Sequence, residues 1–294
     1  MPEIRPLRES DRDDILEIAK HTWGGHDYLP YSFDAWLKDR NSHTAAIEQE
    51  GHVIALANLR VIEDGRTGWM EGLRVHPDYR GKGFAKTLTN HVVQTAIDLR
   101  LERIRYTSAT VNVESLHLGE KVGMKRKFNL AVSWHANPGE IAWRSSTDPL
   151  KEVVSTQLHH NLVDSGLLPS NVIIHDWKAL DATPDALDKI GQTARFWVQK
   201  QDDVIKSFSL GFIRDASGGP QWAFTIYASS ESSFLDHLSH HVGMASENEC
   251  TSMFGAFQEE FSDTFYDLDW AQHEEEEDDE EGEEFALTLL ERVL

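Results

Sequence analysis

Two glycines flanked by basic residues, in the run Arg80-Gly81-Lys82-Gly83, have the residue types and spacing to bind an anion. Glycine has no Cβ, so the backbone N–H groups at Gly81 and Gly83 can turn toward a ligand and approach it closely. Apolar residues recur at helical spacing directly afterwards, which places the turn at a helix N-terminus. Unpaired amides and the positive end of the helix dipole favour anions there, so the expected ligand is a pyrophosphate.

Two common pyrophosphate motifs do not describe this turn. A dinucleotide-binding fold uses G-x-G-x-x-G after its first strand, and a P-loop uses G-x-x-x-x-G-K-[ST]. The run from Val75 to Ala85 instead resembles the coenzyme A motif V-x-P-x-x-R-x-x-G-x-G/A of the GCN5-related N-acetyltransferase (GNAT) superfamily. The resemblance implies acetyl-CoA as a co-substrate, bound by this run and the strand before it: Leu73, Arg74, Val75, Arg80, Gly81, Lys82, Gly83, Phe84 and Ala85.

A second segment, from Asn112 to Met124, resembles the N-x-x-[AS]-x-x-L-Y-E-K-x-G-F pattern of the same superfamily. The resemblance implies that Asn112 and Ser115 contact the pantetheine arm or the phosphates. The tyrosine of that pattern, which usually protonates the departing thiolate, is replaced here by Gly119. Protonation by a side chain at this position is therefore excluded, and water or another side chain must supply the proton.

A third segment, W-G-G-H-D-Y-L-P at residues 23–30, is followed six residues later by Trp36. It resembles a signature of the histidine N-acetyltransferases and their close relatives within the superfamily. The resemblance implies that the first helix–loop–helix forms a wall of the acceptor site, with Asp27 and Tyr28 close to the substrate. It also implies that the acceptor is the α-amino group of a free amino acid, with L-histidine as the first candidate.

Acetyl transfer to an amine requires a polarised thioester carbonyl and an amine that loses a proton before it attacks. Backbone N–H groups around Leu73–Val75, on a strand expected to splay from its neighbour, can donate to the carbonyl oxygen. Glu71 is the first candidate for the general base, because period-two alternation places it on one strand face with Leu73 and Val75. The amine would attack directly in a ternary complex.

Other residues could share the work of Glu71. Asp27 and His26 are alternative bases, and Tyr28, as a second catalytic candidate, could orient an ordered water. A histidine acceptor would also favour Asp27 or Glu71 as the hydrogen-bond partner of its imidazole.

A free amino acid also carries a carboxylate, which arginine binds best through its bidentate guanidinium. Three strand-borne arginines are candidates, and their spacing does not rank them: Arg60, Arg74 and Arg105.

The elements around these residues are expected to follow the superfamily order. Helices are expected after residues 10–13 and after Ser32, which can cap the second of them. The expected strands lie at 3–7, 44–48, 53–62, 68–75 and 103–110. The fold class is therefore α/β (α+β), a GNAT fold with a mixed, mostly antiparallel central sheet followed by a second, degenerate GNAT-like half.

The second half follows a Pro-, Gly- and Ser-rich boundary. We expect residues 1–138 to form the GNAT acetyltransferase domain that binds acetyl-CoA, and residues 150–294 to form the degenerate domain, with an acidic insertion at 274–284. Continuation of the first sheet without a separate domain is the alternative. A helix is expected at 153–162 and another at 232–242, with strands at 172–177, 195–199, 205–213, 221–227, 251–257 and 287–293.

Three histidines in the second half, His237, His240 and His241, have the spacing of one helix face. Such a spacing can hold a metal, but H-E-x-x-H is absent and a partly buried helix face explains them more simply. We expect no metal and no coenzyme in this half.

Composition limits the partners. The chain has 28 basic and 50 acidic residues, a net charge of −22, which argues against nucleic acid and anionic membranes. Cys250 is the only cysteine, and a signal peptide and long apolar runs are absent, so a cytoplasmic protein is expected. The expected partner is a small-molecule amine or amino acid, and the oligomeric state is left open.

Two alternatives to a free amino acid N-acetyltransferase remain from the sequence. One is an enzyme that acetylates proteins or peptides, which an open acceptor groove would favour. The other is a non-catalytic, coenzyme-binding regulatory protein, which the loss of the tyrosine at Gly119 favours.

Overall fold

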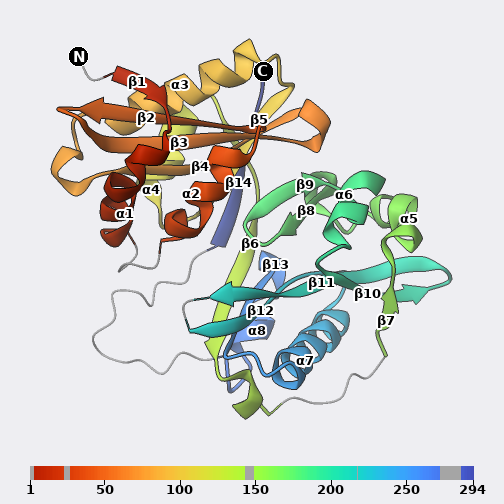
Figure 1. The fold of residues 1–294 in the computed structure, drawn as a ribbon. Coiled ribbons are helices and arrows are strands. Elements are labelled where there is room, and N and C mark those ends of the chain that lie inside the picture. Colours follow the sequence, from red (N-terminus) through yellow and green to blue (C-terminus); the bar gives the residue numbers. More distant parts are fainter. Residues whose placement is uncertain (1–2, 23–26, 143–148, 217, 272–285) are drawn as a thin grey trace. The chain divides into compact units, whose positions relative to one another are not determined.

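The computed structural model describes residues 3–22, 27–142, 149–216, 218–271 and 286–294 (Figure 1). The chain divides into two compact units. The first unit comprises Met1–Ser108, Asn112–Arg126 and Leu290–Leu294, and the second comprises Ala109–Val111 and Lys127–Leu289. Each unit therefore contains a segment that is distant from the rest of it in sequence.

The first unit is a sheet with helices on both faces. Its strands and helices, in chain order, are β1 (Glu3–Pro6), α1 (Arg12–Lys20), α2 (Leu29–Lys38), β2 (Ser42–Gln49), β3 (His52–Ile62), β4 (Thr67–Val75), α3 (Phe84–Asp98), β5 (Arg103–Ala109) and α4 (Val113–Lys121). The strand order follows the sequence from β1 to β5, with β14 (Ala286–Val293) next to β5. Each of the neighbouring pairs β1–β2, β2–β3 and β3–β4 is antiparallel, whereas β5 pairs parallel with β4.

Two apolar cores lie on the opposite faces of this sheet. On one face, α1 and α2 bury Ile15, Phe33 and Trp36 against Leu56 of β3. On the other face, α3 contributes residues such as Leu88 to a core that includes strand residues of β3 and β5. The helices predicted after residues 10–13 and after the pyrophosphate turn are confirmed. Helix α2, however, begins at Leu29 with Pro30 in its first turn, so the prediction that Ser32 caps it is wrong.

A bulge in β4 decides which side chains reach the helices α1 and α2. Asn58 of β3 pairs with Glu71 and Leu56 pairs with Arg74, so Gly72 and Leu73 together stand opposite one residue of β3. Gly72 has φ +69°, and a Cβ there would lie 2.2 Å from the Trp36 ring. Only glycine fits this conformation and this contact.

The extra residue shifts the alternation of the strand. Leu73 and Val75 pack with the core beneath α3. Glu71 and Arg74 face the other way, since their partners Asn58 and Leu56 are on the α1–α2 side of β3. The prediction that Glu71 shares a face with Leu73 and Val75 is therefore wrong, because a bulge at Gly72 breaks the period of two.

The second unit repeats part of this order. Its elements are β6 (Lys125–Ala136, beginning in the first unit), β7 (Lys151–Val153), α5 (His159–Asp164), β8 (Val172–His175), β9 (Lys178–Asp181), α6 (Pro184–Ile190), β10 (Arg195–Gln201), β11 (Val204–Ala216), β12 (Gly219–Ala228), α7 (Glu231–Glu247), β13 (Ser252–Gln258), α8 (Ser262–Tyr266) and the first half of β14, up to Leu289. The strand order is β6-β13-β12-β11-β10-β7. Two antiparallel pairings followed by a helix and a parallel return strand (β10-β11-β12-α7-β13) match β2-β3-β4-α3-β5 of the first unit.

The helix predicted at 153–162 is confirmed only in part, by a short 3-10 helix at Ser155–Gln157 and by α5 from His159. Residues Lys151–Val153 form strand β7, which pairs with β10, and α5 begins only at His159. The apolar residues Val153 and Leu162 are buried by two different elements, so their spacing does not report one helix. The other predicted strands and the helix at 232–242 correspond to described elements.

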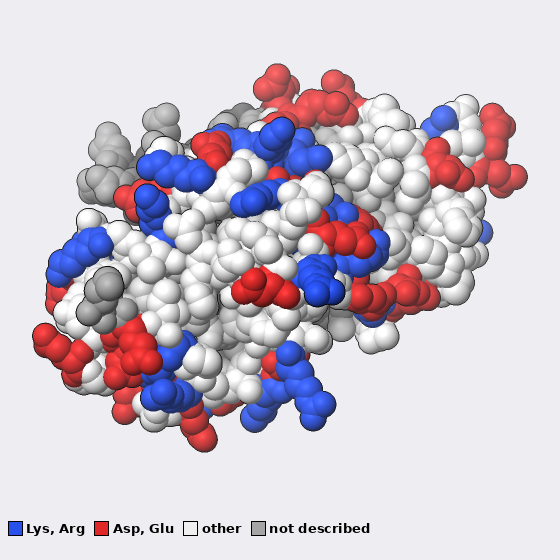
Figure 2. Space-filling view, turned by 90° about the horizontal axis from the view of Figure 1, so that it is seen from above, with Lys and Arg blue, Asp and Glu red and all other residues white. Residues whose placement is uncertain are grey.

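In the described part of the chain, no helix is long and apolar enough to cross a membrane. Acidic and basic side chains lie interspersed on the face drawn in Figure 2. The predicted acidic insertion, 274–284, lies outside the described residues.

Candidate active site

The start of α3 has the geometry of an anion cradle. Gly83 is the residue before the helix, with φ +86°, and Gly81 has φ +73°. A Cβ at either position would meet nothing within 4 Å, so the space beside this backbone is open. Among the described residues, no side chain caps the helix, which leaves its first N–H groups for a ligand. These features fit the pyrophosphate of coenzyme A.

Two basic residues lie on the same loop. Arg80 donates from Nε to the Val75 carbonyl at 3.3 Å, and Lys82 donates from Nζ to the Asp78 carbonyl at 2.9 Å. Both side chains are exposed, so they can turn to a phosphate without the loss of a buried partner. The cradle therefore combines fixed amides with two mobile cations.

The parallel strands β4 and β5 separate after Trp69, within β4 and ahead of this loop. Their ladder runs only from Thr67 and Arg103 to Trp69 and Arg105. Beyond Trp69, the described residues of β4 have no ladder partner on the β5 side, which leaves the backbone N–H groups near Leu73–Val75 on that edge to donate to a carbonyl oxygen. The corresponding pair in the second unit stays joined from Gln221 and Ser252 to Ile226 and Phe257, so no such gap opens along those residues.

The segment before α2 is joined to β4 by a buried ion pair. Arg74 donates from Nε to Asp27 Oδ2 at 2.8 Å and from NH2 to Asp27 Oδ1 at 3.1 Å. The Asp27 side chain is completely buried and also accepts from the Leu29 amide at 3.1 Å. The structure thus brings together three predicted site residues, Asp27, Tyr28 and Arg74, because the Arg74 guanidinium also lies 5.3 Å from the centre of the Tyr28 ring.

Tyr28 places its hydroxyl end among charged groups. The residue is 37% exposed overall, but burial of the hydroxyl raises its pKa to about 12, which Arg74 partly opposes and the nearby Glu71 and Asp27 reinforce. The backbone of Gly72 also bonds to this hydroxyl. The phenol therefore stays protonated near neutral pH and can donate a hydrogen bond beside Glu71.

Glu71 is joined to a polar residue that the sequence analysis missed. Asn58 on β3 is completely buried and donates from Nδ2 to Glu71 Oε1 at 2.9 Å. Thr44 on β2 donates from its hydroxyl to Asn58 Oδ1 at 2.9 Å. The signal in the sequence was a lone amide inside the apolar strand V-I-A-L-A-N-L, where a buried polar group needs a partner.

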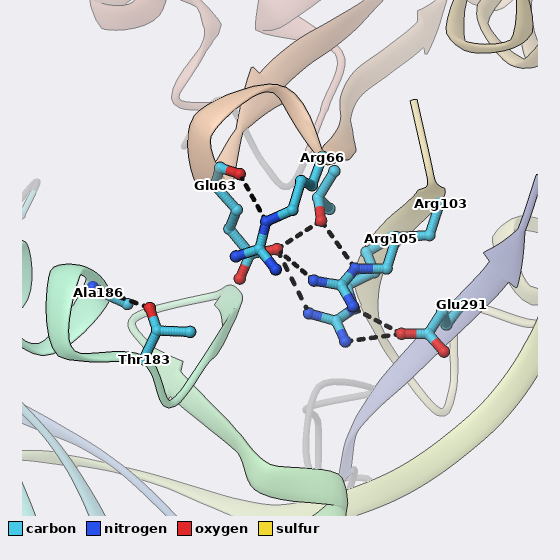
Figure 3. Close-up of polar contacts among 8 residues, drawn as sticks. Glu63, Arg66, Arg103, Arg105, Thr183, Ala186 and Glu291 are labelled. Atoms are coloured by element: carbon cyan, nitrogen blue, oxygen red, sulfur yellow. Dashed lines mark hydrogen bonds and ion pairs between the residues drawn. The ribbon is translucent and has the colours of Figure 1, made fainter. Parts of the chain in front are cut away.

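The other two candidate arginines are held by acidic residues. Arg60 donates from Nε to Asp39 at 2.9 Å. Figure 3 shows Arg105 between two carboxylates, with its NH1 3.7 Å from Glu63 and its Nε 2.7 Å from Glu291 of β14. Arg103 also donates to Glu63, at 2.9 Å. A substrate carboxylate at Arg60 or Arg105 would have to compete with these partners.

The predicted pantetheine contacts lie at the start of α4. Asn112 caps this helix by accepting from the Ser115 amide at 3.2 Å. The Ser115 carbonyl accepts from the Tyr106 hydroxyl at 2.7 Å. That hydroxyl lies 2.3 Å from where a Cβ of Gly119 would be, so a tyrosine from β5 fills the space beside the glycine. Burial raises the pKa of Tyr106 to about 12.

The histidine cluster belongs to the core of the second unit. His237 is fully buried, with Nδ1 2.7 Å from the Ser209 hydroxyl and Nε2 2.9 Å from the Ser207 hydroxyl. His241 accepts from Trp222 Nε1 at 3.1 Å. The predicted buried helix face is confirmed, and groups of three or more potential metal ligands are absent from the described residues. His26, the alternative base, lies outside the described residues.

Two family models match the chain. Residues 12–124 match the acetyltransferase (GNAT) family, and residues 147–258 match the family described as histidine N-acetyltransferase, C-terminal.

Proteins named histidine N-acetyltransferase are similar over much of the chain. The one from Oreochromis niloticus is 26% identical over 84% of this chain and 81% of its own length. The one from Xenopus tropicalis is 27% identical over 67% of this chain and 65% of its own length, so the match spans just under two thirds of that relative. The crystal structure of a candidate acetyltransferase from Thermoplasma acidophilum has a TM-score of 0.61 at 15% identity, covering 99% of this chain and 100% of that one. This last likeness concerns the fold.

Proposed function

We propose that this chain, in which residues 12–124 match the GNAT family of acetyltransferases, transfers the acetyl group of acetyl-CoA to the α-amino group of a free amino acid, with L-histidine as the preferred acceptor. One observation carries the proposal. Beyond Trp69, strand β4 has a backbone edge without ladder pairing to β5, and it leads to the α3 cradle. Glu71 of the same strand lies on the face of α1 and α2, close to Tyr28 from the segment before α2. A coenzyme site and a base are thereby built on one strand. The names of the relatives suggest the acceptor.

In this mechanism Glu71 removes the proton from the amine, directly or through a water that the Tyr28 hydroxyl orients. Backbone N–H groups near Leu73–Val75 donate to the carbonyl oxygen as it gains negative charge. The amine nitrogen then forms the C–N bond, the C–S bond breaks with its electron pair remaining on sulfur, and the second proton of the nitrogen passes to solvent water. Since Gly119 offers no side chain and the Tyr106 proton is used on Ser115, we assign protonation of the thiolate to water.

The acceptor pocket in this proposal is bounded by the segment that Asp27 anchors. Asp27 and Arg74 neutralise one another, so they keep Tyr28 in place without leaving an uncompensated charge beside the substrate. Arg60 and Arg105 stay candidates for the substrate carboxylate only if their present carboxylate partners give way.

The function is tested by release of free thiol from acetyl-CoA with each of the twenty amino acids and with short peptides. We expect turnover with free L-histidine above all other acceptors. Turnover with peptides alone would overturn the amino acid assignment, and no turnover with any amine would favour the non-catalytic alternative. Product identity is checked by tandem mass spectrometry, in which the fragment ions distinguish acetylation of the α-amino group from acetylation of the imidazole.

The base is tested with Glu71→Gln. We expect kcat near neutral pH to fall by about 10²- to 10⁴-fold. Part of the loss should be recovered at higher pH, where more of the amine is already deprotonated. Glu152→Gln on β7 is the matched control, because Glu152 is a strand-borne glutamate of the second unit whose partner is Arg195. A wild-type pH profile for Glu71→Gln would contradict the assignment.

A further inference from the structure

We propose that Asn58 is a positioning residue that selects the oxygen of Glu71 on which the proton is received. The inference rests on the proposed function, since it concerns the base of that reaction. Asn58 is completely buried on β3, directly opposite Glu71 across the strand pair. Its amide nitrogen lies 2.9 Å from Glu71 Oε1, and its amide oxygen lies 2.9 Å from the Thr44 hydroxyl.

The direction of this chain of hydrogen bonds follows from the chemistry of its members. An ionised carboxylate only accepts hydrogen bonds, so the side of Asn58 that faces Glu71 must be its NH₂ group. The carbonyl oxygen of Asn58 then faces Thr44, whose hydroxyl must donate. Ser42 Oγ lies 3.4 Å from the same amide nitrogen and can accept its second N–H. The orientation of the amide is therefore fixed from both ends.

This orientation makes the two oxygens of Glu71 unequal. Oε1 is an acceptor for Asn58 whether or not Glu71 is protonated, because a carboxylic acid keeps its carbonyl oxygen as an acceptor. The proton taken from the amine therefore resides on Oε2, and Asn58 holds that oxygen in one direction. Such an arrangement avoids the rotation of the carboxylate between its two oxygens and keeps a short path to the acceptor.

The surroundings of Glu71 are mixed in charge. Its titratable and charged surroundings include Tyr28, which interacts with Glu71 and Asp27, and Arg74 on its own strand. They also include Arg60, two residues from Asn58 on the same face of β3, with its partner Asp39. Asp27 is neutralised by Arg74, and Tyr28 stays protonated. Asn58 is thus the neutral donor whose replacement changes the charge next to Glu71 most directly.

A matched arrangement in the second unit supplies the control. There, Ser207 donates to Gln199 Oε1 at 3.0 Å, and Gln199 donates from Nε2 to Asp236 at 2.9 Å, so a hydroxyl, an amide and a carboxylate are again joined in the core. These hydrogen-bonded residues lie in the second unit, to which the proposed mechanism assigns no catalytic step. Gln199→Glu therefore imposes the same chemical change, amide to carboxyl, as Asn58→Asp at another buried position.

The decisive experiment compares pH profiles of kcat for histidine acetylation by the wild type, Asn58→Asp and Gln199→Glu. In Asn58→Asp a second carboxylate faces Oε1, so the two acids titrate as a pair and the acid limb should move to higher pH by about one pH unit or more. Gln199→Glu should lower thermal stability but keep the wild-type profile. An unmoved acid limb in Asn58→Asp, or equal movement in both variants, would overturn the proposal.

A second pair of variants tests positioning without added charge. Asn58→Leu should lower kcat on the order of 10- to 100-fold with a much smaller change in the KM for histidine, because the base is misdirected and not removed. Thr44→Val should give a smaller loss, and Thr44→Ser should restore wild-type rates since it keeps the hydroxyl. Equal rates for Thr44→Val and Thr44→Ser would count against the chain of bonds.

The proposal and the function on which it rests fail in distinguishable ways. Absence of thiol release with any amine in the wild type would remove the function. A Glu71→Gln variant with the wild-type profile would remove the base. Loss of the acid limb in Glu71→Gln together with an unmoved limb in Asn58→Asp would leave the function intact and remove only the role of Asn58.

Discussion

At the scale of single residues, Gly119 and Tyr106 form a complementary pair. Tyr106 reaches from β5 to the backbone of α4, donates to the Ser115 carbonyl and fills the position that a side chain at 119 would take. The atoms nearest to a Cβ at 119 are the Tyr106 hydroxyl at 2.3 Å and two of its ring carbons, at 2.9 and 3.0 Å. The absence of a tyrosine on α4 is therefore accompanied by a tyrosine on the neighbouring strand, whose proton points at the helix.

We predict that Gly119→Ala and Tyr106→Leu are strongly coupled in stability. Alone, Gly119→Ala should lower the free energy of unfolding by about 1 kcal/mol, because overlap of about 1–3 kcal/mol outweighs the gain in helix propensity of about 1 kcal/mol. With Tyr106→Leu in place the same change should become neutral or stabilising. Urea unfolding of the four proteins in this cycle gives the coupling energy, expected at about 1–2 kcal/mol. Additive effects would show that the two residues do not compete for space.

At the scale of elements, β4 does most to define the site. Its first residues pair with β5, its middle contains the bulge at Gly72, and its last residues lead into the glycine cradle. The bulge turns Glu71 and Arg74 toward α1 and α2 while Leu73 and Val75 anchor the strand in the core beneath α3. One inserted residue thus separates the polar side chains of the strand, Glu71 and Arg74, from the apolar side chains that pack in the core.

We predict that Gly72→Ala is far more damaging than a comparable change at Gly51. Both glycines have positive φ, +69° and +84°, so each substitution should cost about 1–2 kcal/mol of backbone strain. At Gly72 the new Cβ also overlaps the Trp36 ring, which should add about 1–3 kcal/mol, whereas at Gly51 it meets open space. Thermal and urea unfolding should show the difference, and equal losses at both positions would contradict the role assigned to Trp36.

Local patterns explain what the sequence could predict. Helix spacing and glycine turns depend on neighbouring residues, so the cradle at 80–85, strand 68–75 and the helix that follows were predictable. The bulge was not, because a single glycine in a strand does not say which residue is unpaired. The acidic partners of the candidate arginines were not predictable from local patterns. Asp39 lies 21 residues from Arg60, Asp27 lies 47 residues from Arg74, and Glu291 lies 186 residues from Arg105. The contact of Asn58 with Glu71 was not predicted, because it depends on the register in which β3 and β4 pair.

At the scale of the whole molecule, the two units have different polar interiors. The first contains charged clusters, such as Asp27 with Arg74 and Glu63 with Arg103. The second buries neutral histidines on α7. Burial lowers the pKa of His237 to about 3 and that of His241 well below its usual value. The domain boundary predicted between 138 and 150 stays a prediction about separate folding.

We predict that the second unit loses stability as the pH falls below about 6.5. The folded pKa of these histidines is depressed, so the unfolded chain binds protons that the folded unit does not. The stability that these histidines contribute is therefore fully present above their unfolded pKa. It falls as the pH drops toward 3, by up to about 1.4 kcal/mol per pH unit for each histidine. Melting temperatures measured between pH 4 and 8 should show this slope, and His237→Gln should reduce it. His52→Gln, at an exposed histidine, is the control that should leave it unchanged.

The membership of Leu290–Leu294 in the first unit has a consequence for biosynthesis. Domains generally fold in the order in which the ribosome makes them. Here the first unit cannot gain its contacts of Glu291 with Arg105, or of Arg292 with the Val122 carbonyl, until the whole of the second unit has been translated. Until then, the edge of β5 that pairs with β14 is exposed on the nascent chain. An exposed strand edge can pair with other chains, and chaperones limit this form of aggregation. Completion of the first unit therefore depends on the translation of Leu290–Leu294.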